Sequence, residues 1–178
     1  MLSLTSCVVA QCPPQGSAHN PNKATDNILK NREITFLPIT PITLSQILAD
    51  GPDQTSFSNT TYTQITGYVI DFKQGGKESC NCGTLIDSLN DTHLYIGLTP
   101  YAKKSDCMIA EITPRFKHLN KINPANLVGK QITIEGFLFF DSEHIPSAKN
   151  TCTTCLFIWR KTCTEIHPIT KITIVTNK

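Results

Sequence analysis

Apolar side chains recur at every second position in several separate stretches of the chain, and this pattern constrains the fold more than any other feature. It is clearest in residues 93–99, 107–113 and 131–140. A period of two is that of a β-strand with one buried face. Thr and Ile are abundant and Ala is scarce, which also favours strands. The side chains expected to point inward are Leu94, Ile96, Leu98, Met108, Ala110, Ile112, Ile132, Ile134, Leu138 and Phe140.

The order of the predicted strands indicates the fold class. A long β-rich stretch at residues 61–73 comes first, and the mixed segment 114–127, with helical character, separates the third strand from the fourth. The last strand material lies in residues 156–164 and 166–175, divided near Pro168. This is the order of a five-stranded OB-fold, an all-β Greek-key barrel with minor helix. The alternative is an antiparallel sandwich, which has about seven shorter strands.

Two glycines interrupt the longest predicted strands. Gly67 lies within the first strand and Gly136 within the fourth. Glycine at such positions suits the sharp coiling that a small closed barrel needs. Both positions therefore support a barrel rather than a flat sheet.

The N-terminal part of the chain differs in composition from the rest. The stretch from Cys12 to Lys23 is rich in Pro, Gly, Ser and Asn, which is typical of a flexible tether. We therefore expect a tail over residues 1–30 and an OB-fold domain over residues 31–178. A short helix between Ile42 and Ala49, with Thr43 as its N-cap, is expected near the start of that domain.

Leu4-Thr5-Ser6-Cys7 has the pattern of a bacterial lipobox, in which one apolar residue and two small residues precede the cysteine that receives lipid. The pattern lacks a basic region, and its apolar part is shorter than the about 7–15 residues of a complete signal. No run of about 18 apolar residues occurs, so attachment to a membrane is expected only through a lipid anchor on Cys7. The alternative is a frayed tail in which Cys7 and Cys12 are incidental.

Eight cysteines in 178 residues is a high number. A reducing cytosol rarely accommodates so many, so we expect an oxidising envelope compartment or a metal site. Cys80 and Cys82 lie between the first two strands, and Cys152 and Cys155 lie between the last two. In an OB-fold these two loops flank the ligand-binding mouth. Several interpretations stay open: disulfides that pin the loops together, which an envelope protein favours, a four-cysteine zinc site, free thiols, or a redox centre at Cys152 and Cys155.

Acidic residues and histidines share faces of the predicted strands. Asp91 and His93 lie two positions apart, as do Glu165 and His167. A period of two places each pair on one face of its strand, and Glu111 points away from the inner face of its own strand. A carboxylate beside an imidazole orients it as a base or a metal ligand. Such clusters form either a hydrolytic metal site or, more commonly, a polar outer face.

Several segments resemble a known family. They are the stretches from Leu127 to His144 and from Trp159 to Ile172, supported by Asp91–His93 and Glu111–Arg115. Over about residues 60–176 the chain resembles uncharacterised bacterial envelope proteins described as OB-fold, nucleic-acid-binding lipoproteins. The resemblance implies a cell-envelope location, lipid-anchored or periplasmic, and single-stranded nucleic acid as ligand. The loop cysteine pairs are not part of it, and fold alone does not fix function.

The charge of the chain is mild for a dedicated nucleic-acid binder. The net charge is +2 and the pI is near 8.1, whereas such domains usually have a pI above about 9. We expect a non-enzymatic binding module of the bacterial envelope, with single-stranded nucleic acid, a glycan or an envelope protein as partner. The alternatives are a metal-dependent hydrolase and a structural module. The residues expected to bind the ligand are His93, Tyr95, Glu111, Arg115, His144, Arg160, Glu165 and His167.

Overall fold

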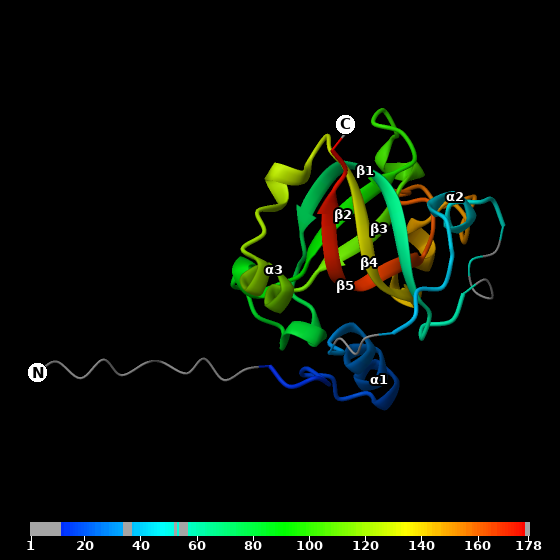
Figure 1. Cartoon of the computed structure of the whole chain (residues 1–178). Coiled ribbons are helices and arrows are strands. Elements are labelled where there is room, and N and C mark those ends of the chain that lie inside the picture. The colour runs from blue at the N-terminus through cyan, green and yellow to red at the C-terminus, as the bar shows by residue number, and fades with distance from the viewer. Residues whose placement is uncertain (1–11, 34–36, 52, 54–56, 177–178) are drawn as a thin grey trace, which may run out of the picture.

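The computed structural model describes residues 12–33, 37–51, 53 and 57–176, in which five strands close into a barrel (Figure 1). Around the barrel the strands follow the order β1-β2-β3-β5-β4, so β1 pairs with both β2 and β4. Neighbouring strands are antiparallel except for β3 and β5, which are parallel. The strands are β1 (Tyr62–Gln74), β2 (Thr92–Gly97), β3 (Met108–Ile112), β4 (Gln131–Phe140) and β5 (Thr164–Ile174).

The connections complete the OB topology. The helix α3 (Pro114–Asn120) joins β3 to β4, and its N-cap Thr113 accepts a hydrogen bond from the amide of Phe116. The parallel pairing of β3 with β5 occurs at Ala110 and Ile166. This strand order, with a helix between the third and fourth strands, confirms the predicted five-stranded all-β barrel. Short 3₁₀ helices lie in the loops: η2 (Ser79–Asn81), η3 (Asp87–Leu89), η4 (Lys104–Asp106), η5 (Pro124–Leu127) and η6 (Ser142–Ser147).

The interior of the barrel is filled by side chains that the alternating pattern places inward. The short helix α2 (Leu44–Ile47) adds two apolar residues, and Thr43 caps it in a capping box with Gln46. Leu98 is an exception among the predicted inward residues, because β2 ends at Gly97 and the side chain is 51% exposed. The central core residues are Ile65, Val69, Leu94, Ile96, Met108, Ala110, Ile112, Ile132, Ile134, Leu138, Ile166 and Ile169.

The last strand differs from the prediction. One continuous strand crosses Pro168, whereas residues 156–163 belong to the loop between β4 and β5. The register between β4 and β5 shifts between Gly136 and Leu138, and Pro168 falls opposite this shift. A proline is tolerated there because no ladder hydrogen bond from its nitrogen is required.

Residues 12–30 do not form the flexible tether that their composition predicts. The helix α1 (Pro21–Lys30) begins at the N-cap Asn20 and contacts β5 and the loop between β1 and β2. Figure 1 shows α1 beneath the barrel. A disulfide between Cys12 and Cys82 fastens the segment before α1 to the same loop. The Asn and Pro residues here begin a helix, which is their common role at a helix N-terminus.

Arg32 fastens the segment that follows α1. Its guanidinium carbon lies 4.1 Å from the ring centroid of Phe137, and its Nη1 donates to the carbonyl oxygen of Asn59 at 2.7 Å. A cation over an aromatic ring contributes about 2 kcal/mol when the pair is desolvated. Phe137 points outward from β4 and is therefore covered by the chain itself.

The predicted lipobox with Cys7 lies outside the described residues. Among the residues that the structure does describe, no helix combines the length and apolar character needed to cross a membrane. The lipid anchor on Cys7 therefore stays a prediction.

Gly136 stands where β4 and β5 approach closely. A Cβ at this position would lie 2.4 Å from Cγ2 of Ile166 and 2.5 Å from the carbonyl oxygen of Pro168. We predict that Gly136→Ala lowers the free energy of unfolding by about 1–3 kcal/mol, the usual effect of overpacking. Urea unfolding followed by circular dichroism measures the change. Gly76→Ala is the matched control, since a Cβ there meets no atom within 4 Å; equal losses in both variants would contradict this account.

Candidate metal centre

A histidine and a carboxylate face each other on the outer side of β2 and β3. His93 and Glu111 are direct cross-strand partners, and His93 Nε2 lies 3.3 Å from Glu111 Oε1. Their neighbours Leu94 and Ala110 point into the core, so His93 and Glu111 point away from it. Both side chains are nevertheless buried. Something other than the barrel must therefore cover them.

β5 adds a second histidine and carboxylate. Because β5 runs beside β3, Ile166 enters the core and its neighbours Glu165 and His167 point outward toward Glu111. His167 Nδ1 lies 3.2 Å from Glu111 Oε2 and 3.4 Å from Glu165 Oε1. Glu165 and His167 are fully buried. The two sequence pairs thus converge on one outer face.

The loop between β1 and β2 supplies two more carboxylates. Asp91 is buried just before β2, and its Oδ2 lies 3.8 Å from His167 Nε2. The side-chain amide of Asn81 donates to the same oxygen at 2.9 Å. Glu78 Oε1 lies 3.7 Å from His93 Nε2. The loop therefore closes over the histidines from one side.

The helix α1 covers the same face. Lys30, its last residue, is buried, with Nζ 3.5 Å from Glu78 Oε2 and 5.4 Å from the ring centroid of Phe139. Asn27 donates to the hydroxyl of Ser79 at 3.0 Å, which joins the helix to η2. OB-folds usually bind ligands beside β2 and β3. Here the groups on this face form an outer-face cluster, buried except for the half-buried Glu78, of Lys30, Glu78, Asp91, His93, Glu111, Glu165 and His167.

Arg160 extends the cluster into a longer network. Its guanidinium donates to Asp141 Oδ2 at 2.9 Å and to Glu165 Oε2 at 3.0 Å, and all three side chains are buried. Asp141 also contacts His144 Nδ1. A guanidinium that bridges two carboxylates forms strong charge-assisted hydrogen bonds. His144, whose side chain is 35% exposed, is the outermost group of this network.

The buried charges do not balance. Four buried carboxylates (Asp91, Glu111, Asp141 and Glu165) and the half-buried Glu78 face two permanent cations, Lys30 and Arg160. A buried charge without a counter-charge costs several kcal/mol. The deficit of three charges is met either by protons on the histidines and carboxyls or by a divalent metal ion together with one such proton.

Bound protons supply part of the missing positive charge in the metal-free protein. Burial raises the pKa of Glu111 well above its ordinary range. Burial acts to lower the pKa of His167, but the nearby carboxylates of Glu111, Glu165 and Asp91 outweigh it, so this pKa lies above its ordinary value. Both shifts favour the protonated forms of these side chains, and a metal ion would compete with their protons.

Four polar atoms of the cluster are buried and make no hydrogen bond: Asp91 Oδ1, His93 Nε2, Glu111 Oε2 and His167 Nε2. The close approaches of His93 to Glu111 and of Glu111 to His167 lack the geometry of a hydrogen bond. Such orphaned atoms are rare in folded proteins. One ligand atom each from Asp91, Glu111 and His167 lies within 4.8 Å of the others. The Nδ1 atom of His167 faces Glu165, which leaves Nε2 free, as is usual for a metal-binding histidine. The residues present therefore fit a divalent ion with nitrogen and oxygen ligands.

Two of the predicted ligand residues lie apart from the outer-face cluster. Tyr95 is buried in a smaller apolar cluster, with its ring 6.2 Å from that of Trp159. Arg115 lies on α3 and pairs with Glu33 at an exposed position. The structure therefore does not bring all eight predicted residues into one site.

Two members of the cluster have no distinctive sequence signal. Glu78 lies in a polar loop, and Lys30 reaches the cluster only because α1 folds onto the barrel. Asp91 did have a signal in its spacing from His93. Carboxylates two positions from a strand histidine include Asp91 but not Glu78. No such spacing rule applies to Lys30, which is a cation on a separate helix.

The cysteines form disulfides, but these do not join the two loops. Cys82 pairs with Cys12, and Cys152 pairs with Cys155 three positions away. The prediction of disulfides is confirmed for Cys82, Cys152 and Cys155, whereas a bridge between the loops and a four-cysteine zinc site are wrong. The cause is the N-terminal segment, which brings Cys12 beside Cys82. Cys80 is a free, buried thiol.

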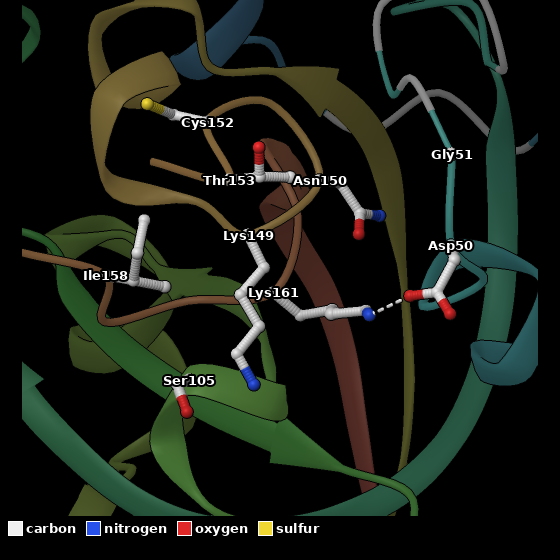
Figure 2. Close-up of a pocket in the computed structure, with 9 residues that line it drawn as sticks. All are labelled: Asp50, Gly51, Ser105, Lys149, Asn150, Cys152, Thr153, Ile158 and Lys161. Atoms are coloured by element: carbon white, nitrogen blue, oxygen red, sulfur yellow. Dashed lines mark hydrogen bonds and ion pairs between the residues drawn. The ribbon is translucent and has the colours of Figure 1, made fainter. Parts of the chain in front are cut away.

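A cavity of about 880 Å³ lies elsewhere, between the β4–β5 loop and the chain after α2 (Figure 2). Its charged side chains already have partners, since Lys161 pairs with Asp50, as Figure 2 shows, and Lys149 pairs with Asp106. Asn150 donates to a backbone carbonyl. The outer-face cluster, with its orphaned atoms, is therefore the stronger candidate. The cavity is lined by Asp50, Gly51, Ser105, Lys149, Asn150, Cys152, Thr153, Ile158 and Lys161.

Comparison with known proteins identifies no relative: no protein-family model matches the chain, and no curated protein matches it significantly. The resemblance to envelope lipoproteins therefore stays a prediction. The function has to be argued from the geometry of the outer-face cluster.

Asp141 offers a test of the buried network through pH. Burial acts to raise the pKa of Asp141, but the hydrogen bond from His144 and the charge of Arg160 outweigh it and hold this pKa below its ordinary value. Such a carboxylate stabilises the fold above its unfolded pKa of about 3.9, and the stabilisation is lost as the pH falls. We predict that Asp141→Asn costs about 3–5 kcal/mol at neutral pH. It should also reduce the loss of stability on acidification, as measured by urea unfolding across the acid range.

The control for this prediction is Asp106→Asn, which removes a partly exposed partner of Lys149. Surface ion pairs contribute about 0–1 kcal/mol, so we expect little change. A similar loss in both variants, or an unchanged acid dependence in Asp141→Asn, would contradict the stabilising role of the buried pair.

Proposed function

We propose that this chain is a non-enzymatic binding module that holds a divalent metal ion on the outer face of its barrel. Asp91, Glu111 and His167 are the central ligands. The observation that supports the proposal is their convergence: each carries a buried atom without a hydrogen-bond partner, and the three lie within coordinating reach of one ion.

Burial favours a structural ion over a catalytic one. A catalytic metal keeps an open coordination position that substrate or water can reach. Asp91, Glu111 and His167 are each less than a tenth exposed, beneath α1 and the β1–β2 loop. A metal-dependent hydrolase is therefore the weaker alternative.

The ion would join three parts of the chain that are distant in sequence. Asp91 precedes β2, Glu111 lies on β3 and His167 lies on β5. Two of these strands are the parallel pair that closes the barrel. Because the complete ligand set exists only in the folded chain, the free energy of metal binding adds to the free energy of folding.

The partners implied by the resemblance remain separate proposals. Single-stranded nucleic acid, a glycan or an envelope protein would meet a surface that α1 leaves open, and the envelope location would explain the oxidised cysteines. Oligonucleotide affinity that falls with rising salt would support a nucleic-acid partner. The lack of any salt-dependent affinity would argue against it.

Metal binding should stabilise the protein measurably. We expect full-length protein, freed of metal with EDTA under non-reducing conditions, to unfold at a higher temperature after addition of Zn²⁺. At a free metal concentration about 100 times the Kd, the gain is about 2.7 kcal/mol. Thermal unfolding and titration calorimetry measure the effect. If no divalent ion tested gives a heat of binding or raises the unfolding temperature, the proposal is refuted.

Glu111→Gln separates metal binding from folding. Burial raises the pKa of Glu111 well above its ordinary range, which favours its protonated form in the metal-free protein, and glutamine resembles that form. We expect the metal-free variant to lose much less than the about 3–5 kcal/mol that breaking a buried ion pair costs, while its metal affinity falls at least about tenfold. His118→Ala, at an exposed position on α3, should keep the wild-type affinity. Equal losses of affinity in both variants would count against Glu111 as a ligand.

A further inference from the structure

The two disulfides in the described part of the chain close loops of very different length. Cys12–Cys82 spans 70 positions and fastens the segment before α1 to the β1–β2 loop. Cys152–Cys155 spans three positions and lies within the β4–β5 loop. A disulfide restrains the unfolded chain less when the loop that it closes is shorter. The second bridge therefore contributes much less to the stability of the fold than the first.

Backbone hydrogen bonds already hold the β4–β5 loop together. The amide of Lys149 donates to the carbonyl oxygen of Arg160 at 3.1 Å, and the amide of Asn150 donates to that of Lys161 at 2.9 Å. These bonds pair the two arms of the loop, and residues 151–158 form the tip beyond them. Both cysteines of the short bridge lie in this tip. Their bond can therefore break while the arms stay paired.

The free thiols among the described residues are unsuited to exchange. Cys80, Cys107 and Cys163 are all buried. Burial raises the pKa of the Cys80 thiol far above its ordinary value, raises the pKa of Cys107 to about 12 and also raises the pKa of Cys163. The thiolate is the reactive form of cysteine, and these shifts disfavour it. Cys152 and Cys155, by contrast, are both partly exposed.

Exposed apolar side chains follow the short bridge directly. Leu156 is 90% exposed and Phe157 is 83% exposed. The cavity of about 880 Å³ is lined in part by Cys152 and Thr153, which Figure 2 shows at one side of it. Apolar side chains beside a concave surface suit an extended polypeptide. An unfolded chain offers both apolar side chains and accessible thiols, whereas a folded protein buries most of them.

We propose that Cys152–Cys155 is a redox-active disulfide that oxidises paired thiols of a reduced, unfolded polypeptide. Exposed disulfides that the fold does not depend on are commonly the labile or catalytic ones. This activity goes beyond the proposed binding function and does not depend on the metal centre.

The exchange balances with the substrate as the reductant. A substrate thiol ionises, its sulfur bonds to Sγ of Cys155, which lies between the exposed residues Thr154 and Leu156, and the bridge breaks so that Cys152 leaves as a thiolate. The second substrate thiol ionises and attacks the substrate sulfur of the mixed disulfide, which forms the substrate disulfide and releases Cys155. Two electrons pass to the bridge, and the two protons lost by the substrate protonate the two cysteines.

Equilibration with glutathione provides the first test. Full-length protein with its disulfides intact is held in mixtures of reduced and oxidised glutathione, its free thiols are alkylated, and its peptides are identified by mass spectrometry. We expect Cys152–Cys155 to become reduced where [GSH]²/[GSSG] is at least about tenfold lower than Cys12–Cys82 requires. Equal sensitivity of the two bridges, or earlier reduction of Cys12–Cys82, would overturn the inference.

Oxidation of a peptide tests the activity itself. The probe is an apolar synthetic peptide with two reduced cysteines, mixed with one equivalent of oxidised full-length protein in the absence of oxygen. We expect the peptide disulfide to form as the bridge is reduced. The double variant Cys152→Ala with Cys155→Ala should lose this reaction, and Cys107→Ala should keep it. Leu156→Ser with Phe157→Ser should slow it at least about tenfold but leave reduction of the bridge by dithiothreitol unchanged.

The outcomes separate the activity from the substrate class. A peptide that stays reduced with the wild-type protein, or is still oxidised by the variant without the bridge, overturns the redox activity. Unchanged peptide oxidation in the variant with two serines overturns only the preference for apolar chains. If the variant without the bridge does not fold, the glutathione measurement on the wild-type protein decides the matter. Metal binding is measured separately, so its failure leaves this inference standing.

Discussion

Charge removed from water is the constraint on which the outer part of this structure depends. The barrel core is apolar and self-sufficient, but β2, β3 and β5 present histidines and carboxylates on their outer side, and the chain then covers them. Ions buried in this way are tolerated only when counter-charges surround them. Arg160 supplies one and Lys30 another, each from a different segment. The remaining negative charge is what gives the site its chemistry.

The position of α1 changes how this barrel compares with other OB-folds. The β1–β2 loop closes over the histidines beside β2 and β3, where such barrels commonly hold their ligands, and α1 packs against this loop and β5. Outward aromatic side chains of β4 are covered too, Phe137 by Arg32 and Phe139 by Lys30. A surface that could stack bases has thus become an interior layer. Its polar groups are buried, and we propose that they surround a small ion rather than a polymer.

The fold was largely predictable, because local pattern decides it. β2 and β3 bury one apolar face in the core, so apolar side chains recur at every second position in their sequences. β5 was harder, since both of its faces are buried where it carries Glu165 and His167, and Pro168 imitates a strand end. The predicted order of the strands and the helix between β3 and β4 are nevertheless correct.

The site was predictable only in part. Strand period places His93, Glu111, Glu165 and His167 on outer faces, but only the barrel topology brings β5 beside β3. Burial of that face depends on α1, whose docking rests on contacts far apart in sequence. The partner of Cys82 depends on the same path of the chain. The composition of the site, its burial and the partner of Cys82 therefore depend on tertiary contacts, which no local sequence pattern encodes.

β5 has a consequence for the way the molecule is made. It lies between β3 and β4 in the closed barrel, and it also carries His167. A ribosome adds this strand after the other four, so the partly synthesised chain has an open sheet and only part of the ligand set. Uptake of metal at the proposed centre would thus be confined to chains translated through β5. Cells that supply the ion would retain it only on completed molecules, and clipped or prematurely terminated chains would stay metal-free.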